Sequence, residues 1–222
     1  MSGPSTAIPA CAKPSTAYHA TPLHYLPSIL ADGALYAKDV MISRGILPRS
    51  SAVRRDRMLG LGCYIHFALR LESPLLLDKL RKGYPHVVLE FDAASLVRLA
   101  GSGSIATNTK AWRSKSCFDV SPVCETGDLK PLAHGRLPSR ELLVKYAADL
   151  DGLKKIVFTS PEERALVDEL MRSLGVAIHL PCPTRAYAGI AYRPLYMDQV
   201  TNYFRACAAA GVVLKPPDIP FD

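Results

Sequence analysis

The histidine in the stretch Tyr18-His19-Ala20-Thr21 is the first candidate for a residue that takes part in chemistry. It stands between an aromatic and a small residue, and a segment marked by Pro27 and expected to be helical follows it. Such a histidine has two interpretations. It can be a structural residue that is satisfied by hydrogen bonds at the end of a strand, or it can form, with Tyr18 and Thr21, the floor of a nucleotide pocket. These residues alone do not decide between the two.

A carboxylate much later in the chain is the second candidate. Glu141 follows a long polar segment and precedes the apolar run Leu142 to Val144, a pattern that predicts a side chain at the mouth of a sheet. A solvated residue at the start of a strand produces the same pattern. The position of Glu141 alone therefore does not establish a catalytic role.

Positive charge is the third feature, because the 222 residues carry a formal net charge of +7. The positive charge is uneven and includes three clusters, which are Arg44, Arg49, Arg54, Arg55 and Arg57, then Lys79, Arg81 and Lys82, and finally Lys110, Arg113 and Lys115. A basic surface attracts polyanions such as nucleic acids through steering and counterion release. An ordinary solvated surface is the alternative, and the charge alone favours neither.

Motifs that the sequence lacks exclude several functions. It contains no GxGxxG after a strand, no GxxxxGK[ST], no HExxH and no GxSxG, so a Rossmann cofactor, a P-loop and an α/β-hydrolase triad are not supported. The cysteines form no CxxC pair and have no histidine at metal-ligand spacing. This pattern favours free thiols in a reducing compartment over a disulfide framework or a metal site, so no metal is expected.

The elements that must position these residues indicate an α+β fold. Residues 1–16, rich in Ser, Thr, Pro and Ala, are expected to be a flexible tail rather than a secretory signal, and residues 17–222 a single domain. No apolar run approaches the length of about twenty residues that a bilayer requires. The free thiols expected from the cysteine pattern make the cytoplasm the expected location. The predicted strands are 17–21, 35–36, 63–69, 86–91, 141–146, 155–159 and 176–180. The predicted helices are 24–32, 75–82, 93–99, 161–174 and 197–210. Two long irregular segments are predicted over 38–60, with room for a helical turn, and over 101–138.

Three of these segments, taken in order, resemble the DarT-type nucleic-acid (DNA) ADP-ribosyltransferase toxins. YHATPLHYLPSILADGAL resembles the opening motif of that family, a Tyr-His-x-Thr strand before a helix that ends in Gly-x-Leu. RRDRMLGLGCYIHFALRLESPLL is similar to its twin-arginine segment and the aromatic strand that follows, and SRELLVKYAADLDGLKKIVF to the strand that bears its catalytic glutamate. Together they cover about a third of the chain. The resemblance implies an ADP-ribosyltransferase-like fold, in which a central split sheet of short strands is surrounded by peripheral helices and two long loops.

The same resemblance implies roles for individual residues, with NAD as co-substrate. Glu141 would be the catalytic carboxylate, which stabilises an oxocarbenium-like ribose and accepts the proton of the attacking base. Arg55 would orient Glu141 or neutralise the pyrophosphate, with Arg54 as the alternative if the alignment slips by one residue. The expected cofactor-binding residues are His19, Thr21, Tyr18, Arg54, Phe67 and Tyr64. The expected substrate-binding residues are Lys110, Arg113 and Arg140, near the segment before Glu141 that would contact the acceptor.

The chain also departs from the family pattern. His66 and Ala68 stand where the family often has a proline and an aromatic residue, and Ser139 stands where many transferases have Gln or Glu. The residue two before the glutamate helps to select the acceptor, so these departures leave the identity of the modified base open.

The function expected from this resemblance is NAD-dependent mono-ADP-ribosylation of a nucleobase in single-stranded DNA, a pentosyl transfer that releases nicotinamide. The enzyme would act as a monomeric toxin of a toxin–antitoxin or phage-defence system, with a cognate antitoxin of ADP-ribosyl-hydrolase activity as a partner and no membrane partner. A single-stranded target suits the basic segments, because an enzyme that acts on a base needs it out of the stack. The alternatives are an ADP-ribosyltransferase or NAD-dependent 2′-phosphotransferase that acts on RNA, and a non-catalytic nucleic-acid-binding module.

Overall fold

The computed structural model describes residues 16–46, 56–71, 73–99, 105–107, 117–119, 141–187 and 195–219. The strands are β1 (Thr16–Pro22), β2 (Ala34–Tyr36), β3 (Tyr64–Ala68), β4 (His86–Asp92), β5 (Ile105–Thr107), β6 (Cys117–Asp119), β7 (Glu141–Lys145), β8 (Ala147–Asp149) and β9 (Leu153–Val157). The helices are α1 (Leu26–Asp32), α2 (Lys38–Ser43), α4 (Pro74–Arg81), α5 (Ala93–Leu99), α8 (Pro161–Ser173) and α9 (Met197–Ala210), with short 3₁₀ turns at Leu23–Tyr25 and Leu150–Gly152.

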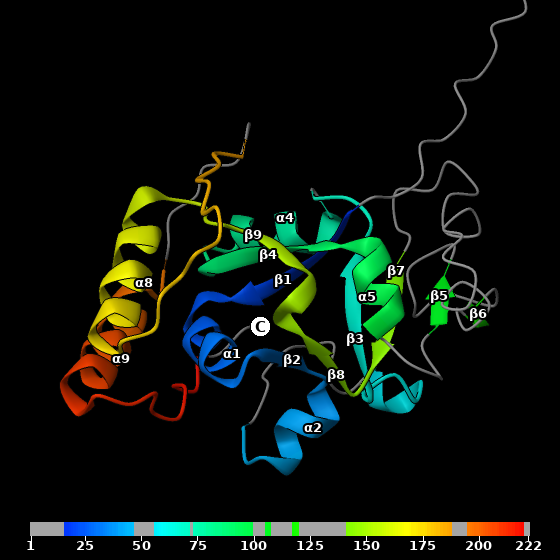
Figure 1. The fold of residues 1–222 in the computed structure, drawn as a ribbon, viewed down its shortest axis with the longest axis horizontal. Coiled ribbons are helices and arrows are strands. Elements are labelled where there is room, and N and C mark those ends of the chain that lie inside the picture. The colour runs from blue at the N-terminus through cyan, green and yellow to red at the C-terminus, as the bar shows by residue number, and fades with distance from the viewer. Residues whose placement is uncertain are drawn as a thin grey trace, which may run out of the picture.

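Seven of these strands form one antiparallel sheet in the order β6-β5-β7-β3-β1-β4-β9, and β2 and β8 form a small second sheet. The helices α8 and α9 lie side by side at one end of the molecule, next to the β1-β4-β9 half (Figure 1). The strands β3, β7, β5 and β6 lie toward the opposite end (Figure 1). Apart from β5 and β6, neighbouring strands in this sheet are far apart in the chain, so the sheet brings distant residues together.

The large sheet is split in its middle. Strand β1 pairs with β4 along its whole length, from Thr16 opposite Asp92 to Pro22 opposite His86. With β3, by contrast, β1 shares the single pair Tyr18–Ala68. The halves β6-β5-β7-β3 and β1-β4-β9 are therefore joined at one point within the described strands and diverge beyond it. This is the split sheet of short strands that the sequence predicted.

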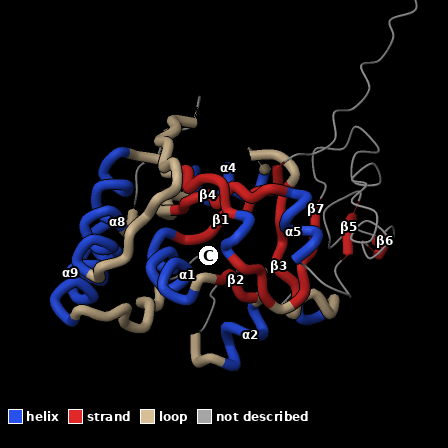
Figure 2. Tube along the Cα trace, viewed as in Figure 1, coloured by secondary structure: helices blue, strands red, loops and turns tan. Residues whose placement is uncertain are grey.

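Alternation along the strands separates two layers of apolar side chains. The larger layer contains Ala17 of β1, Phe67 of β3 and Phe91 of β4, and it packs against α1, α5, α8 and α9. On the other face, Val88 and Val157 pack against Leu76 and Leu80 of α4. Figure 2 shows the strands enclosed by helices in this way, with α4 behind the sheet and α5 in front of it.

Local signals explain where the helices begin and end. Ser160 accepts a hydrogen bond from the Glu163 backbone N–H (3.2 Å) at the start of α8, and Pro161 occupies the first turn. The helix α1 ends at Gly33, whose φ of 66° is the left-handed conformation that glycine adopts without steric cost. Both ends agree with the sequence-based prediction.

The structure differs from the prediction in three segments. The segment 38–60, predicted as irregular with room for a helical turn, contains the six-residue helix α2, which has no side-chain cap. The segment 101–138, also predicted as irregular, contains the short strands β5 and β6. The strand predicted over 176–180 does not form, although Val176, Ile178 and Leu180 pack against the core. The chain instead reaches β9 at Pro181 and Pro183, whose carbonyls accept hydrogen bonds from Ile156 and Phe158. Prolines have no N–H to donate, and the described pairing there is one isolated parallel bridge, Phe158–Thr184, with the Arg185 N–H donating to the Phe158 carbonyl (2.9 Å).

The expected N-terminal tail, apart from Thr16, lies outside the described residues. No helix of the described ranges is long and apolar enough to cross a membrane. Within those ranges, Cys63, Cys182 and Cys207 are free thiols.

Candidate active site

His19 lies on β1 directly beside the split in the sheet. Its Nδ1 lies 3.0 Å from the backbone carbonyl oxygen of His66 on β3, and 47 residues separate the two along the chain. A carbonyl can only accept, so Nδ1 carries the hydrogen and donates it. The imidazole therefore bridges the two half-sheets next to the single backbone pair that joins them.

The charge state of His19 follows from its surroundings. Burial lowers its pKa to about 4, since desolvation disfavours the charged ring, and the hydrogen bond to His66 only partly opposes this effect. The ring is consequently neutral at physiological pH. With the hydrogen on Nδ1, the lone pair is on Nε2, which can accept a hydrogen bond from a ribose hydroxyl.

Aromatic rings hold the His19 imidazole on one side. Its centroid lies 5.6 Å from that of Phe67, which in turn packs edge-on against Phe91 at 5.4 Å. Phe67 is fully buried (0% exposed). Phe67 therefore lies in the core behind His19. Its expected cofactor-binding role stays a prediction, and Phe67 would exert it through the His19 ring.

The segment that follows the twin arginines is anchored close to this histidine. Asp56, the residue after Arg55, is buried and forms an ion pair with Lys38 at the start of α2. The positive charge of Lys38 contributes to the lowered pKa of His19. In addition, the Asp39 backbone N–H donates to the Gly62 carbonyl (3.0 Å), and a Cβ on Gly62 would lie 2.5 Å from the Asp39 carboxylate. The helix α2 and residues 56–62 thus form one packed unit beside His19.

Glu141 is the first residue of β7, where its Cα pairs with Ala68 on β3 and Thr107 on β5. In the same register His66 pairs with Leu143, so His66 and Glu141 are diagonal neighbours on one face of the sheet. Their side chains meet, with His66 Nδ1 3.5 Å from Glu141 Oε2. Both side chains are about a quarter exposed. The carboxylate therefore lies at the surface with one oxygen next to an imidazole.

His66 consequently connects the two candidate residues His19 and Glu141. Its backbone carbonyl binds His19, and its side chain contacts Glu141. Sequence reasoning recorded His66 only as a departure from a family pattern. The contact follows from the β3–β7 register, which a single sequence does not reveal.

This arrangement can do specific chemistry. A neutral histidine with a free lone pair can bind a sugar hydroxyl, and a carboxylate across the split can stabilise developing positive charge or accept a proton.

Within the described ranges, no group of three or more His, Cys, Asp or Glu side chains could hold a metal ion.

Comparison with known proteins identifies structures with the same fold as this chain. No family model matches the chain, and no curated protein sequence matches it. Among solved structures, Thermus sp. 2.9 DarT in complex with NAD⁺ matches with a TM-score of 0.58 and 20% identity, covering 79% of this chain and 99% of that one. The complex of the same DarT with ADP-ribosylated ssDNA matches with a TM-score of 0.58 and 18% identity over 79% and 98% of the two chains.

Thermosipho africanus DarTG in complex with ADP-ribose also matches, with a TM-score of 0.59 and 13% identity over 76% of this chain and 49% of that one. The chain has the fold of DarT. The α+β architecture expected from the sequence resemblance is thereby confirmed.

On this DarT fold, the remaining candidates divide between the two faces of the sheet. Tyr64 shares the face of Glu141, where it packs half-buried against Leu61 and Leu143. Tyr18 lies on the same face but packs against the apolar layer under α4. Thr21 lies on the opposite face with His19 and is 5% exposed. The structure thus joins His19 and Glu141 through His66, and it does not join Tyr18 and Thr21 to each other.

Five candidates lie outside the described residues: Arg54, Arg55, Lys110, Arg113 and Arg140. The roles that the sequence resemblance implies for them remain predictions.

Proposed function

We propose that this chain is an NAD-dependent ADP-ribosyltransferase that modifies a base in single-stranded DNA. The observation that carries the proposal is the junction at which His66 joins His19 to Glu141 across the split of a DarT fold. It is supported by the complexes of Thermus DarT with NAD⁺ and with ADP-ribosylated ssDNA, because the chain shares that fold over almost the whole of DarT.

In the proposed reaction the glycosidic bond between the ribose C1′ and the nicotinamide nitrogen breaks. Its electron pair leaves with nicotinamide, which departs as a neutral molecule. A base nitrogen donates its electron pair to C1′, and the proton of that nitrogen passes to the Glu141 carboxylate. Positive charge builds on the ribose in the transition state, and the Glu141 carboxylate stabilises it. His19 holds a ribose hydroxyl through its Nε2 lone pair.

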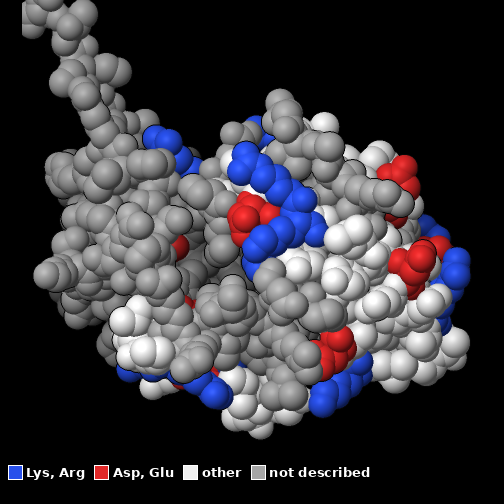
Figure 3. All heavy atoms as spheres, turned by 180° about the vertical axis from the view of Figure 1, so that it is seen from behind, with Lys and Arg blue, Asp and Glu red and all other residues white. Residues whose placement is uncertain are grey.

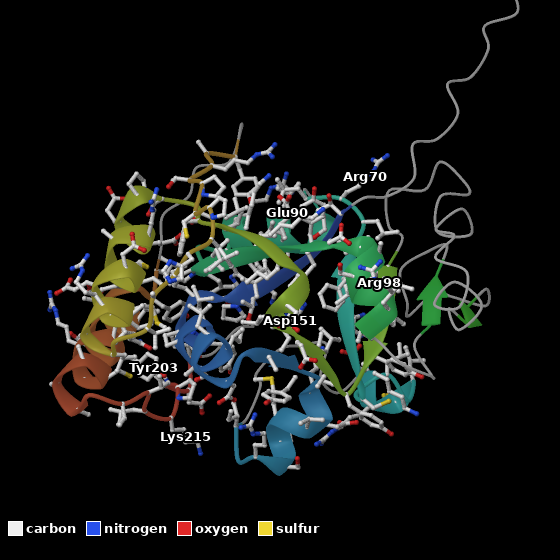
Figure 4. The ribbon with its side chains drawn as sticks, viewed as in Figure 1. Arg70, Glu90, Arg98, Asp151, Tyr203 and Lys215 are labelled. Carbon is white, nitrogen blue, oxygen red and sulfur yellow. The ribbon has the colours of Figure 1, made fainter. Side chains whose placement is uncertain are left out.

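The surface charge of the described residues is mixed rather than uniformly basic. Figure 3 shows Lys and Arg side chains gathered beside Asp or Glu side chains near the middle of the face opposite to that of Figure 1. On the α4 face, Lys82 pairs with Asp78 (3.4 Å) and Lys155 with Glu90 (3.3 Å). The exposed Arg70 follows β3 and reaches away from the molecule (Figure 4), so it is available to a phosphate. The proposal therefore depends on the site rather than on total charge.

The proposed setting is a toxin of a toxin–antitoxin or phage-defence system, with an antitoxin that removes ADP-ribose as its partner. We place the enzyme in the cytoplasm, since the free thiols of Cys63, Cys182 and Cys207 suit a reducing compartment.

Incubation of the purified chain with radiolabelled NAD and matched oligonucleotides tests the proposed function. Labelled ADP-ribose should transfer to single-stranded DNA, and Glu141→Gln should reduce the transfer by at least about a hundredfold because the substituted amide can neither stabilise the ribose charge nor accept the proton. Mass spectrometry of the digested oligonucleotide then names the modified base.

The matched control is Glu169→Gln, which changes an exposed glutamate on α8 and should retain full transfer. Transfer by Glu141→Gln at the wild-type rate would contradict the role of Glu141. Transfer to RNA but not to DNA of the same sequence would move the acceptor to RNA. Absence of both transfer and NAD-dependent thermal stabilisation would favour a non-catalytic binding module.

A further inference from the structure

His66 contacts Glu141 but has no role of its own in the proposed reaction steps. Its side chain, about a quarter exposed, places Nδ1 at 3.5 Å from Oε2 of Glu141. Its other ring nitrogen, Nε2, is buried and has no hydrogen-bond partner within the described part of the chain. The backbone of the same residue is fixed by the hydrogen bond from His19.

The partners of the ring determine where its hydrogen lies. A carboxylate is an acceptor only, so Nδ1 must carry a hydrogen to interact favourably with Glu141. In the Nδ1–H tautomer the lone pair is on Nε2. A buried acceptor without a partner costs about 1–3 kcal/mol of folding free energy, and such atoms in native proteins require an explanation.

We propose that His66 is a positioning residue for Glu141: its Nδ1–H holds the Oε2 oxygen, and its Nε2 accepts a hydrogen bond from a donor on the bound substrate. This inference rests on the proposed function. The contact with His66 thereby orients the Glu141 carboxylate that faces the ribose and accepts the proton of the attacking base. The donor that meets Nε2 is an N–H or O–H group, supplied either by NAD or by the nucleic acid.

The length of the contact is consistent with this role. A distance of 3.5 Å exceeds the 2.7–3.2 Å of a strong N–H···O hydrogen bond. Catalytic hydrogen bonds are often long before substrate arrives and shorten in the complex. A carboxylate with one oxygen fixed has less orientational freedom to lose when the reaction begins. Correct placement matters, because a catalytic group displaced by about 1 Å can slow the reaction about a hundredfold.

Three substitutions separate the two functions of the ring. The amide nitrogen of His66→Asn takes the approximate place of Nδ1, so this variant keeps the donor to Glu141 and loses Nε2. The amide of His66→Gln takes the approximate place of Nε2, so it loses the donor at Nδ1. His66→Phe keeps a planar ring and loses both nitrogens. His179→Asn, at an exposed histidine remote from β3 and β7 in the chain, is the matched control.

Transfer kinetics with NAD and single-stranded DNA give the expected pattern. His66→Gln and His66→Phe should lower kcat by about tenfold to a hundredfold. His66→Asn should keep kcat within about threefold of wild type and raise one KM. A higher KM for NAD assigns the donor to NAD, and a higher KM for DNA assigns it to the nucleic acid. If His66 had only a structural role, the three variants would not separate into some with a lower kcat and one with a higher KM.

Three results would overturn the inference. If kcat of His66→Gln stays within about twofold of wild type, or if His66→Asn is as slow as His66→Phe, the Nδ1 donor does not position Glu141. If neither KM changes in His66→Asn, Nε2 accepts nothing from the substrate. Thermal unfolding of each variant shows whether the comparison is made between folded proteins.

A second measurement needs no activity. In long-range ¹H–¹⁵N spectra of protein labelled at histidine, His66 should show the Nδ1–H tautomer in wild type and lose it in Glu141→Ala, with the resonance assigned by its absence in His66→Asn. An Nε2–H tautomer in wild type would overturn the contact. If the wild-type chain transferred no ADP-ribose while His66 showed the Nδ1–H tautomer, the proposed function would fail and the contact would stand.

Discussion

At the scale of single residues, the protonation of His19 decides which of its atoms can meet a ligand. The His66 carbonyl fixes the hydrogen on Nδ1, and burial keeps the ring neutral by lowering its pKa to about 4. The atom presented to a sugar hydroxyl is therefore an acceptor. A positively charged ring would have offered only donors and would have repelled the positive charge that develops on the ribose.

His19→Ala should weaken NAD binding by about fivefold to a hundredfold, which corresponds to one lost hydrogen bond of about 1–3 kcal/mol. The affinity is measured by calorimetry in a Glu141→Gln background, so that turnover does not consume the ligand. His179→Ala removes an exposed imidazole and should leave the Kd for NAD unchanged. An equal Kd for His19→Ala and its parent would show that the histidine is structural.

Residue types predicted these candidates, but register decided how they meet. His19 and Glu141 could be selected because histidine and carboxylate are chemically distinctive and precede predictable elements. The connection between His19 and Glu141 could not be predicted from the sequence, because it depends on Ala68 pairing with both Tyr18 and Glu141. The alternation of side chains along β1 also places Tyr18 on the face opposite His19. What each face contacts becomes known only when the neighbouring strands are known.

At the scale of elements, the ends of helices were predictable where side chains mark them. The observed α9 (Met197–Ala210) and α5 (Ala93–Leu99) have the predicted bounds. The start of α8 contains a detail that the capping pattern did not show. The Glu163 carboxylate is almost completely buried and accepts hydrogen bonds from the backbone N–H (3.0 Å) and the hydroxyl of Thr159, one residue before the cap. This glutamate therefore ties the end of β9 to the helix.

Glu163→Ala should lower the free energy of unfolding by about 1–3 kcal/mol, because the Thr159 N–H loses its acceptor in a partly buried position. Urea denaturation measures the change. Glu169→Ala, at an exposed position of the same helix, should change stability by less than about 0.5 kcal/mol. Equal effects of the two substitutions would show that the Thr159 contacts do not stabilise the fold.

At the scale of the whole molecule, buried histidines make stability depend on pH. Burial is the main cause that lowers the pKa of His19 and His86 to about 4 and that of His24 to about 3. In the unfolded chain each of them titrates near its ordinary value of about 6.5. Between these values the unfolded state binds more protons than the folded state, so protonation favours unfolding.

The free energy of unfolding should therefore fall as the pH decreases from about 6.5 toward 4, by up to about 1.4 kcal/mol per pH unit for each of the three histidines. Urea denaturation at pH 7, 6 and 5 measures the slope. His24→Gln should flatten it by the contribution of one proton, whereas His179→Gln should leave it unchanged. A stability that stays constant from pH 7 to pH 5 would contradict the neutral state of these rings.

Tyr146 gives the fold one further property. It links β7 to β8 with a φ of 64°, a left-handed conformation that costs a residue with a side chain about 1–2 kcal/mol. Its N–H donates to the Cys63 carbonyl (2.7 Å) and its carbonyl accepts from the Ala37 N–H (2.8 Å), so the residues before α2 and β3 both hold it. Strain of this kind persists only where neighbouring structure enforces it. Tyr146 is thus a strained residue whose backbone links the start of α2 and the start of β3 to the end of β7, the strand that carries Glu141.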